Sequence, residues 1–486
     1  MIFTEPYPEE KNSRFQTFLS GLLCFSKKTI FIFNRRLSSA ILLSEINKLT
    51  INTKFMKQFI SILSLIILFQ FQTFAQPLVE TKPENVGFSS EKLKLVDDLA
   101  NQYVIEGKTP GGVILVARKG KIVYYKNFGY RDIGKREKAQ KDDIFRIASM
   151  SKAITTVGIM QLFERGLIGF DEPVHKYIPA FKQTRVLESF DASDSSYTTV
   201  QTKSPITIRQ LLTHTSGIPY SDYKGNNLNV IFQKFGLTQV GLSHASLTTE
   251  DFINQLAKVP LAFQPGERYQ YGLNMDVLGR VIEVVSGMKL SDYFRKNIFD
   301  PLGMNDTWFY LPKEKQNRLY PVFSHTDNGL VQATESGMIK LLDYPKRDDN
   351  NHYAGGGGLS STAMDYARFI QALLNNGQLD GKRILSRKTI EVMTADQMVA
   401  LNKEGKGYSQ IPGNTYCLGF SLITEQAKGM NSKSVGTYEW GGYFSTKFFI
   451  DPQEELIFVG MTQVSPNRHG YFWDRVTTLV YSAITD

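Results

Sequence analysis

The motif Ser149-Met150-Ser151-Lys152 is the most informative stretch of this 486-residue chain. If a helix begins here, Ser149 and Lys152 stand one turn apart on the same face. A serine hydroxyl becomes a nucleophile when a neighbouring base accepts its proton, and a lysine amine can be that base where its surroundings disfavour the charged form. The alternative is a surface helix that Ser149 merely caps. The apolar segment that follows, Ser151–Arg165, predicts a buried helix, which is less typical of a merely capped surface helix, but the motif alone leaves both interpretations open.

Two other segments carry candidate site residues. In Pro265–Gly279, Tyr271 lies on a predicted loop between a Pro-Gly turn and an apolar helix. A phenol there could carry protons beside an ammonium group, although a packing tyrosine is the plainer interpretation. In Trp440-Gly441-Gly442-Tyr443, the glycines begin a strand and would let a substrate lie close to backbone N–H groups. The plainer interpretation of this segment is the start of an ordinary strand.

Strand patterns lie near both ends of the chain, and helical patterns lie between them. Two hairpins are predicted where β-rich runs flank short turns: Val113–Ala117 with Ile122–Tyr125, and Lys447–Ile450 with Leu456–Gly460. Helices are predicted over Ser151–Arg165, Ile208–Leu212, Thr249–Leu256, Asp276–Ser286, Ser291–Asn297 and Trp473–Ser482. The polar or glycine-bearing tracts Asp191–Ser204 and Tyr220–Ser243 are predicted to be loops. The pattern indicates a sheet built from the two chain ends, with a helical region inserted.

The three motifs, in this order and at these separations, resemble the serine β-lactamase/penicillin-binding-protein superfamily. The likeness is closest to class C β-lactamases and family VIII carboxylesterases, and it runs from about Gly87 to the C-terminus. Three accessory stretches fit the same family: Leu211–Pro219, Asp300–Met304 and Gly355–Thr362.

The resemblance implies a β-lactamase-like α/β (α+β) fold. An antiparallel sheet flanked by helices would come from about 87–148 and 350–486, and an all-helical domain from about 149–349 would be inserted in it. The active site would lie in the cleft between these two parts of the 87–486 hydrolase domain. His214 and the Gly355–Gly358 run would be scaffold, the first a loop histidine and the second a tight backbone passage.

The resemblance also implies a role for each motif. Ser149 would be the acylated nucleophile, and Lys152 and Tyr271 would share the base and acid roles. The backbone N–H groups of Ser149 and Tyr443 would form the oxyanion hole, with Trp440-Gly441-Gly442 beside the substrate. A carbonyl substrate would form an acyl-enzyme that water then hydrolyses.

Two departures from the class C pattern bear on the substrate. The second motif usually reads Tyr-x-Asn, but here Leu273 takes the Asn position and Asn274 falls one residue later. The third motif usually reads Lys-Thr-Gly, and its lysine helps to bind a substrate carboxylate; here Trp440-Gly441-Gly442 stands in its place. Both changes look like the esterase branch. The direction of Lys447, just beyond the motif, is left open by the sequence.

Several rival functions remain. A peptidase acting on cell-wall or D-amino-acid peptides, or a β-lactamase, would share the nucleophile and differ in the groups that recognise a carboxylate. An α/β-hydrolase is disfavoured because the sequence has no Gly-x-Ser-x-Gly elbow. A non-catalytic binding or sensor relative has no chemical need for Ser149, Lys152 and Tyr271 together. We therefore expect an esterase-like serine hydrolase acting on a small-molecule ester, amide or peptide.

Composition excludes other classes of protein. Hydrophobic residues make up 42% and charged residues 21% of the chain, which excludes a disordered chain and a polytopic membrane protein. The net charge is +9, of which residues 1–75 supply +5, so nucleic acid is not an expected partner. Cys24 and Cys417 are too few for a disulfide framework, and the six histidines do not fall at metal-ligand spacing. No metal or cofactor is expected.

Residues 56–75 resemble a secretory signal peptide, with a positive start, an apolar run over Phe59–Phe69 and a cleavage point after Ala75. The run is short for a transmembrane helix, although an N-terminal anchor is the alternative. We interpret residues 1–55 as a misassigned upstream extension, with translation beginning at Met56. The signal predicts an exported protein, either periplasmic or secreted.

Overall fold

The structure is a computed structural model that describes residues 78–486, except 222–227, 238–240, 245, 335–341 and 350. The chain divides into Met1–Phe74 and Ala75–Asp486, and all described residues belong to the second unit. The predicted upstream extension and signal peptide lie outside the described residues. Among the helices of the described part, none is long and apolar enough to cross a membrane.

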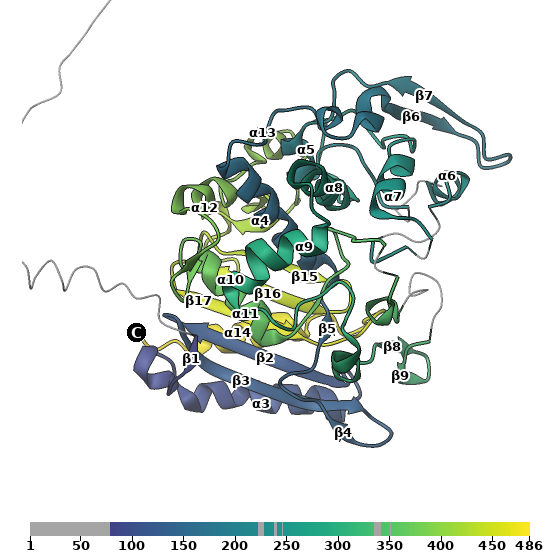
Figure 1. Cartoon of the computed structure of the whole chain (residues 1–486). Helices are drawn as coiled ribbons and strands as arrows, with labels where there is room; N and C mark the ends of the chain where they lie inside the picture. The colour runs from purple at the N-terminus through teal and green to yellow at the C-terminus, as the bar shows by residue number, and fades with distance from the viewer. Residues whose placement is uncertain (1–77, 222–227, 238–240, 245, 335–341, 350) are drawn as a thin grey trace, which may run out of the picture. The chain divides into compact units, whose positions relative to one another are not determined.

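A central sheet joins the two ends of the chain (Figure 1). Its strand order is β1-β3-β2-β17-β16-β15-β14-β13, with β4 beside β3. The strands are β1 (Val79–Glu80), β2 (Gly111–Arg118), β3 (Lys121–Asp132), β4 (Glu137–Lys138), β13 (Asn414–Tyr416), β14 (Ser421–Ile423), β15 (Tyr438–Gly442), β16 (Thr446–Asp451) and β17 (Leu456–Met461). Both predicted hairpins form, and β2 pairs antiparallel with β17, which confirms the sheet built from both ends. Within the described sheet, the edge strand β1 pairs in parallel with β3, and the other neighbouring strands are antiparallel.

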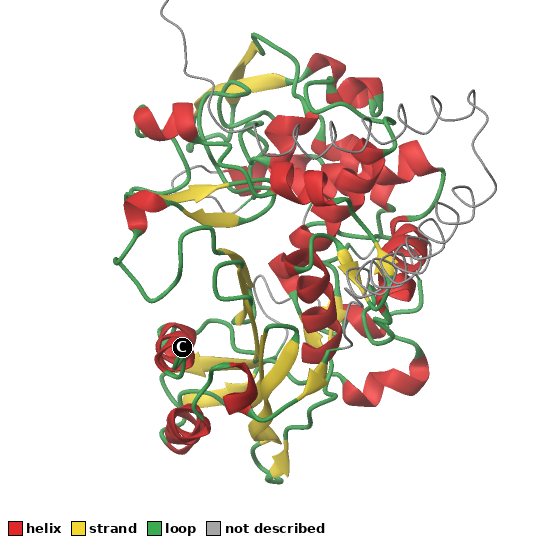
Figure 2. Cartoon of the chain, turned by 90° about the vertical axis from the view of Figure 1, so that its left-hand side faces the viewer, coloured by secondary structure: helices red, strands yellow, loops and turns green. Residues whose placement is uncertain are grey.

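Helices cover both faces of this sheet (Figures 1 and 2). Because side chains alternate along a strand, Ile114 and Val116 of β2 face α3 (Ser90–Ile105) and α14 (Phe472–Ser482). Val113 and Leu115 face the opposite way, into the larger core that also includes α11 (Ala363–Leu374). Strand β2 is buried along its whole length for this reason.

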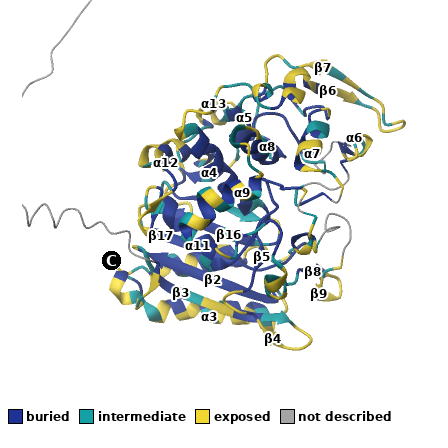
Figure 3. Cartoon of the chain, in the orientation of Figure 1, coloured by how far each residue is buried: buried dark blue, intermediate teal, exposed yellow. Residues whose placement is uncertain are grey.

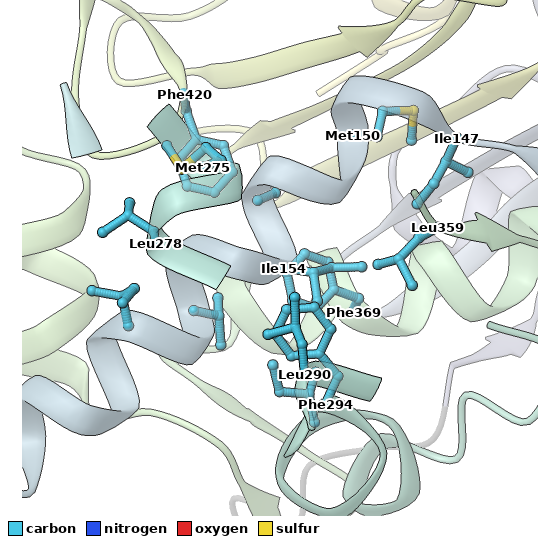
Figure 4. Close-up of a cluster of buried hydrophobic side chains, with 14 of the residues drawn as sticks. Ile147, Met150, Ile154, Met275, Leu278, Leu290, Phe294, Leu359, Phe369 and Phe420 are labelled. Carbon is cyan, nitrogen blue, oxygen red and sulfur yellow. The ribbon is translucent and has the colours of Figure 1, made fainter. Parts of the chain in front are cut away.

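The helix α4 (Ser151–Glu164) lies within the larger core and is buried from Ser151 to Leu162, as predicted (Figure 3). Ile154 of α4 packs in a cluster of apolar side chains from several elements (Figure 4). A Cβ on Gly158 would stand 2.8 Å from Ile282 Cδ1 of α8, so the absence of a side chain lets the two helices approach closely. The other helices are α5 (Ile208–Leu212), α6 (Leu228–Lys234), α7 (Thr249–Leu256), α8 (Asn274–Ser286), α9 (Leu290–Phe294), α10 (Asp300–Leu302), α12 (Arg387–Met393) and α13 (Val399–Lys403).

The predicted loop Asp191–Ser204 is instead part of a hairpin between β6 (Arg185–Phe190) and β7 (Tyr197–Gln201). Its strand residues are mostly half-buried or exposed, so their polar character reflects contact with solvent rather than a lack of strand structure. A second hairpin, β8 (Phe323–Thr326) with β9 (Gly329–Gln332), means that the inserted region is mostly but not wholly helical.

The predicted loop Tyr220–Ser243 also contains regular structure. Helix α6 within it buries Leu228, Ile231 and Phe232, which recur at the three- and four-residue spacing of one helix face. The helix has only seven residues and lies between polar and glycine-bearing stretches. Its apolar spacing is therefore too short to predict a helix from the sequence.

Candidate active site

Ser149 lies in a tight turn that connects the sheet region to α4. The turn, Ala148–Met150, is a single 3-10 turn, and Ala148 has a φ of +42°. A residue with a Cβ adopts that left-handed conformation only at a cost in energy, so the surrounding contacts must hold the turn. One of them is Tyr366 of α11, whose hydroxyl donates to Met150 O at 2.9 Å. Ser149 is thus held on a sharp bend and is only half-buried.

Lys152, one turn later, is fully buried and contacts three oxygen atoms. Its Nζ lies 3.2 Å from Ser149 Oγ, 3.3 Å from the Tyr220 hydroxyl and 2.6 Å from the carbonyl oxygen of Gly356. A buried amine needs such acceptors when it is charged. The contact with Ser149 places a base beside the nucleophile, as the sequence motif predicts.

Tyr271 joins this pair from the loop before α8. The Lys152 Nζ lies 4.6 Å from the centroid of the Tyr271 ring, and the Tyr271 hydroxyl accepts a long hydrogen bond of 3.4 Å from Trp440 Nε1. A Cβ on Gly272 would stand 1.9 Å from Ile218 O, so only glycine allows the loop to pass there. The structure therefore brings the three predicted motifs together around Lys152.

His214 contacts the Tyr271 loop through hydrogen bonds and ring packing. Its Nδ1 accepts hydrogen bonds from Asn274 Nδ2 at 2.8 Å and from Gly272 N at 3.4 Å, and its ring lies 4.8 Å from that of Tyr271. Burial, reinforced by the charge of Lys152, lowers the pKa of His214 well below its usual value. The imidazole is neutral, and it occupies a scaffold position. The side chain of Asn274, the amide displaced by one residue in the second motif, is used in this support.

The third motif forms the end of β15. A Cβ on Gly442 would stand 2.4 Å from Ile147 O, so this glycine lets the strand lie against the Ser149 turn. Gly441 pairs with Lys447 on β16, and Tyr443 follows the strand with 43% of its surface exposed. Within the described residues, neither the Ser149 N–H nor the Tyr443 N–H donates to a protein acceptor. Both amides are free to bind a substrate oxygen.

Lys447 points away from this site. Its Nζ lies 3.3 Å from Asp474 of α14 and 3.7 Å from Glu439. Trp440, one position before the residue that pairs with Lys447, points instead toward Tyr271, because neighbouring strand positions face opposite sides of the sheet. Lys447 therefore does not replace the lysine that the third motif lacks.

Aromatic rings form one wall beside Lys152 and Tyr271. The ring of Trp440 lies 5.6 Å from Tyr271, 6.0 Å from Tyr408 and 5.4 Å from Tyr416, measured between centroids. The Tyr220 ring lies 5.6 Å from that of Tyr271. The half-buried rings of Tyr220, Tyr271, Tyr408 and Trp440 offer apolar contact and hydroxyl groups to a substrate, whereas Tyr416 is fully buried behind them.

Two contacts of the site were missed by sequence reasoning. Tyr220 was placed in a predicted loop, and its position directly after the Leu211–Pro219 stretch was the only signal available. Gly356 was interpreted as scaffold, and the close fit of its run is confirmed, since a Cβ on Gly357 would stand 2.0 Å from Gly241 O. The further function of Gly356, as an acceptor for Lys152, depends on packing alone.

The described residues contain no cluster of His, Cys, Asp or Glu suited to a metal ion.

Comparisons with known proteins agree with this geometry. A family model described as Beta-lactamase matches residues 96–480. Protein Rv1367c of Mycobacterium tuberculosis (strain ATCC 25618 / H37Rv) is 30% identical over 74% of this chain and 87% of its own length. Esterase EstB of Burkholderia gladioli is 26% identical over 73% of this chain and 86% of its own. The solved structure of EstCE1, a hydrolase with promiscuous acyltransferase activity, is 25% identical and covers 82% of this chain and 99% of its own, with a TM-score of 0.68.

The family match runs through both halves of the sheet and all three motifs, and the solved structure of a hydrolase superposes on the same arrangement. The expected β-lactamase-like fold is confirmed. This chain belongs to the beta-lactamase family and is a serine hydrolase.

Proposed function

We propose that this protein hydrolyses carboxylic esters through an acyl-enzyme on Ser149. The observation that carries the proposal is the contact between the buried Lys152 Nζ and Ser149 Oγ, at 3.2 Å, with the Tyr271 ring beside the amine. The similarity to Esterase EstB supports an ester as the substrate, and the similarity to EstCE1 supports a hydrolase.

In this mechanism Lys152 accepts the proton of Ser149 as Oγ attacks the ester carbonyl. The free N–H groups of Ser149 and Tyr443 stabilise the oxyanion of the tetrahedral intermediate. When the intermediate collapses, the C–O bond to the alcohol breaks, and the proton returns from Lys152 to the leaving alcohol, directly or through the Tyr271 or Tyr220 hydroxyl. Water then attacks the acyl carbonyl and gives a proton to Lys152. The bond to Ser149 Oγ breaks, Oγ takes the proton back from Lys152, and the carboxylic acid leaves.

The charges around the site favour an uncharged ester over a substrate with a carboxylate. Trp440 occupies the position of the missing lysine, and Lys447 is engaged by Asp474 and Glu439 on the other side of β15. A carboxylate bound beside Trp440 would lose its hydration without gaining an ion pair, which is costly. This argues against a D-amino-acid peptidase and against a β-lactamase.

A substrate panel tests this proposal with the full chain. We expect turnover of p-nitrophenyl acetate, with kcat/KM at least about 100-fold higher than for a D-alanyl-D-alanine peptide or for a β-lactam, because no lysine stands beside Trp440 to bind their carboxylate; that ratio corresponds to about 2.7 kcal/mol. Hydrolysis rates measured by absorbance and by release of D-alanine give the comparison. A preference for the peptide or the β-lactam would contradict the ester assignment while leaving the acyl-enzyme intact.

We further propose that the protein is exported after cleavage behind Ala75. The apolar run and the small residue at the cleavage point support this proposal. Expression in a host with a periplasm, followed by intact mass measurement, should give a chain that starts at Gln76. A protein that keeps residues 56–75 and stays with the membrane fraction would favour the anchor instead.

A further inference from the structure

Asp276 is a buried acid near the site that the mechanism above does not use. It lies in the first turn of α8, five residues after Tyr271, and is 3% exposed. Its Oδ1 accepts a hydrogen bond of 3.3 Å from Gly356 N, and its Oδ2 accepts none from any described group. Burying a carboxylate with an unpaired oxygen is costly, so its retention calls for a physical reason.

Gly356 connects Asp276 to Lys152. The same residue donates its N–H to Asp276, and its carbonyl oxygen accepts a hydrogen bond of 2.6 Å from Lys152 Nζ. The fit is tight, since a Cβ on Gly356 would stand 2.5 Å from Asp276 Oδ2. Gly355 is held on the other side, where its carbonyl accepts from Thr155 Oγ1 at 2.7 Å. A carboxylate on α8 and a lysine on α4 thus hold one glycine between them.

Lys152 is the charged side chain that acts on Asp276. Burial raises the pKa of Asp276 to about 6, and the charge of Lys152 opposes that rise. His214, from the loop after α5, is neutral. Other ionisable groups on helices packed against α8 are engaged elsewhere or face solvent: Glu250 of α7 pairs with Arg280, Arg209 of α5 pairs with Asp171, and Asp292 of α9 is exposed. Among the described groups, Asp276 is therefore the carboxylate placed to stabilise a charge on Lys152.

We propose that Asp276 is a positioning residue that supplies the counter-charge for Lys152, acting through Gly356. When Lys152 takes the proton of Ser149 it becomes an ammonium, and the Asp276 carboxylate, which is already in place, stabilises the positive charge that forms. The same carboxylate fixes the Gly356 peptide and so aims the Lys152 Nζ at Ser149 Oγ. This inference rests on the proposed role of Lys152 as the base, but not on the identity of the ester.

The test follows the activation of Ser149 directly. A fluorophosphonate probe reacts with an activated serine: Oγ forms a bond to phosphorus, fluoride leaves, and the serine proton passes to the base. The second-order labelling rate of the full chain is measured by intact mass from pH 5 to 9. We expect Asp276→Asn, which keeps an oxygen for Gly356 N–H, to label at least about tenfold more slowly at pH 8, as for a misdirected catalytic group.

The pH profile separates this role from a structural one. In the parent protein, labelling should fall as the pH drops through about 6, because Asp276 is then protonated and the counter-charge is lost. Asp276→Asn should lack that step. Because a raised pKa means that the ionised acid destabilises the folded state above about pH 6, the variant should unfold at the same or a higher temperature at pH 8.

Asp365→Asn is the matched control. Asp365 is also buried, and burial raises its pKa to about 6, but it lies at the start of α11 and bonds Thr307 and the Asp306 N–H. The Asp365→Asn variant should keep the labelling rate of the parent protein and the fall in that rate near pH 6. The proposal is overturned if Asp276→Asn labels at the parent rate, or if it slows while the step remains. Labelling of the parent without ester turnover would instead overturn only the ester assignment.

Discussion

Replacing Ser149 by alanine should abolish hydrolysis of p-nitrophenyl acetate and leave the protein folded. The loss should be about 10⁴-fold or more, since the mechanism has no other nucleophile at this position. Ser149 is half-buried in a turn held by Tyr366, so its hydroxyl contributes little to stability, and the unfolding temperature should stay within about 2 °C. Steady-state rates and a thermal melt of the full chain check both expectations.

Intact mass gives a second readout for this variant. The parent protein should gain the mass of one acyl group when mixed rapidly with excess ester, and Ser149→Ala should gain none. Ser151→Ala is the control, because Ser151 lies in the same motif but its Oγ accepts a hydrogen bond from Leu359 N. It should keep turnover within a few-fold of the parent. Turnover that persists in Ser149→Ala would reject the acyl-enzyme.

The sheet could be predicted because its strands carry their own local signals. Val113–Ala117 and Leu456–Gly460 are runs of β-formers beside turns, and each hairpin pairs neighbours in sequence. The pairing of β2 with β17 spans most of the chain: the distribution of strand and helix patterns predicted a sheet built from both ends, but not which strands meet in it. The β6–β7 hairpin was missed because an exposed hairpin has no apolar face to reveal its period.

Only those residues of the candidate site that belong to a sequence motif could be predicted. Ser149 and Lys152 meet because they are three positions apart, which is about one helical turn. Tyr220 and Gly356 are 68 and 204 residues from Lys152, and no spacing rule reaches across such distances. Their contacts arise from the packing of α4 against α8 and the glycine run. The same is true of Lys447, whose direction depends on the strand register.

Replacing Lys152 by methionine should reduce ester turnover and fluorophosphonate labelling by about 10³-fold or more. Methionine has a similar length and fills the same buried space, so the loss isolates the amine from its packing. Because the buried Asp276 carboxylate loses its counter-charge, the unfolding temperature at pH 8 should fall, and turnover is measured well below it. A parallel titration from pH 6 to 10 should show no recovery of labelling in this variant at high pH.

Lys447→Met is the matched control for this substitution. Lys447 is a partly buried lysine on β16, and its ammonium contacts Asp474 and Glu439 on the side of β15 away from Trp440. Its loss should leave turnover within a few-fold of the parent, with any cost appearing in stability, since Lys433 continues to pair with Glu439 at 2.6 Å. If Lys152→Met kept turnover within tenfold of the parent, the base would have to be one of the two phenols, Tyr271 or Tyr220. The counter-charge role of Asp276 would then fail with it, because that role acts only through the ammonium.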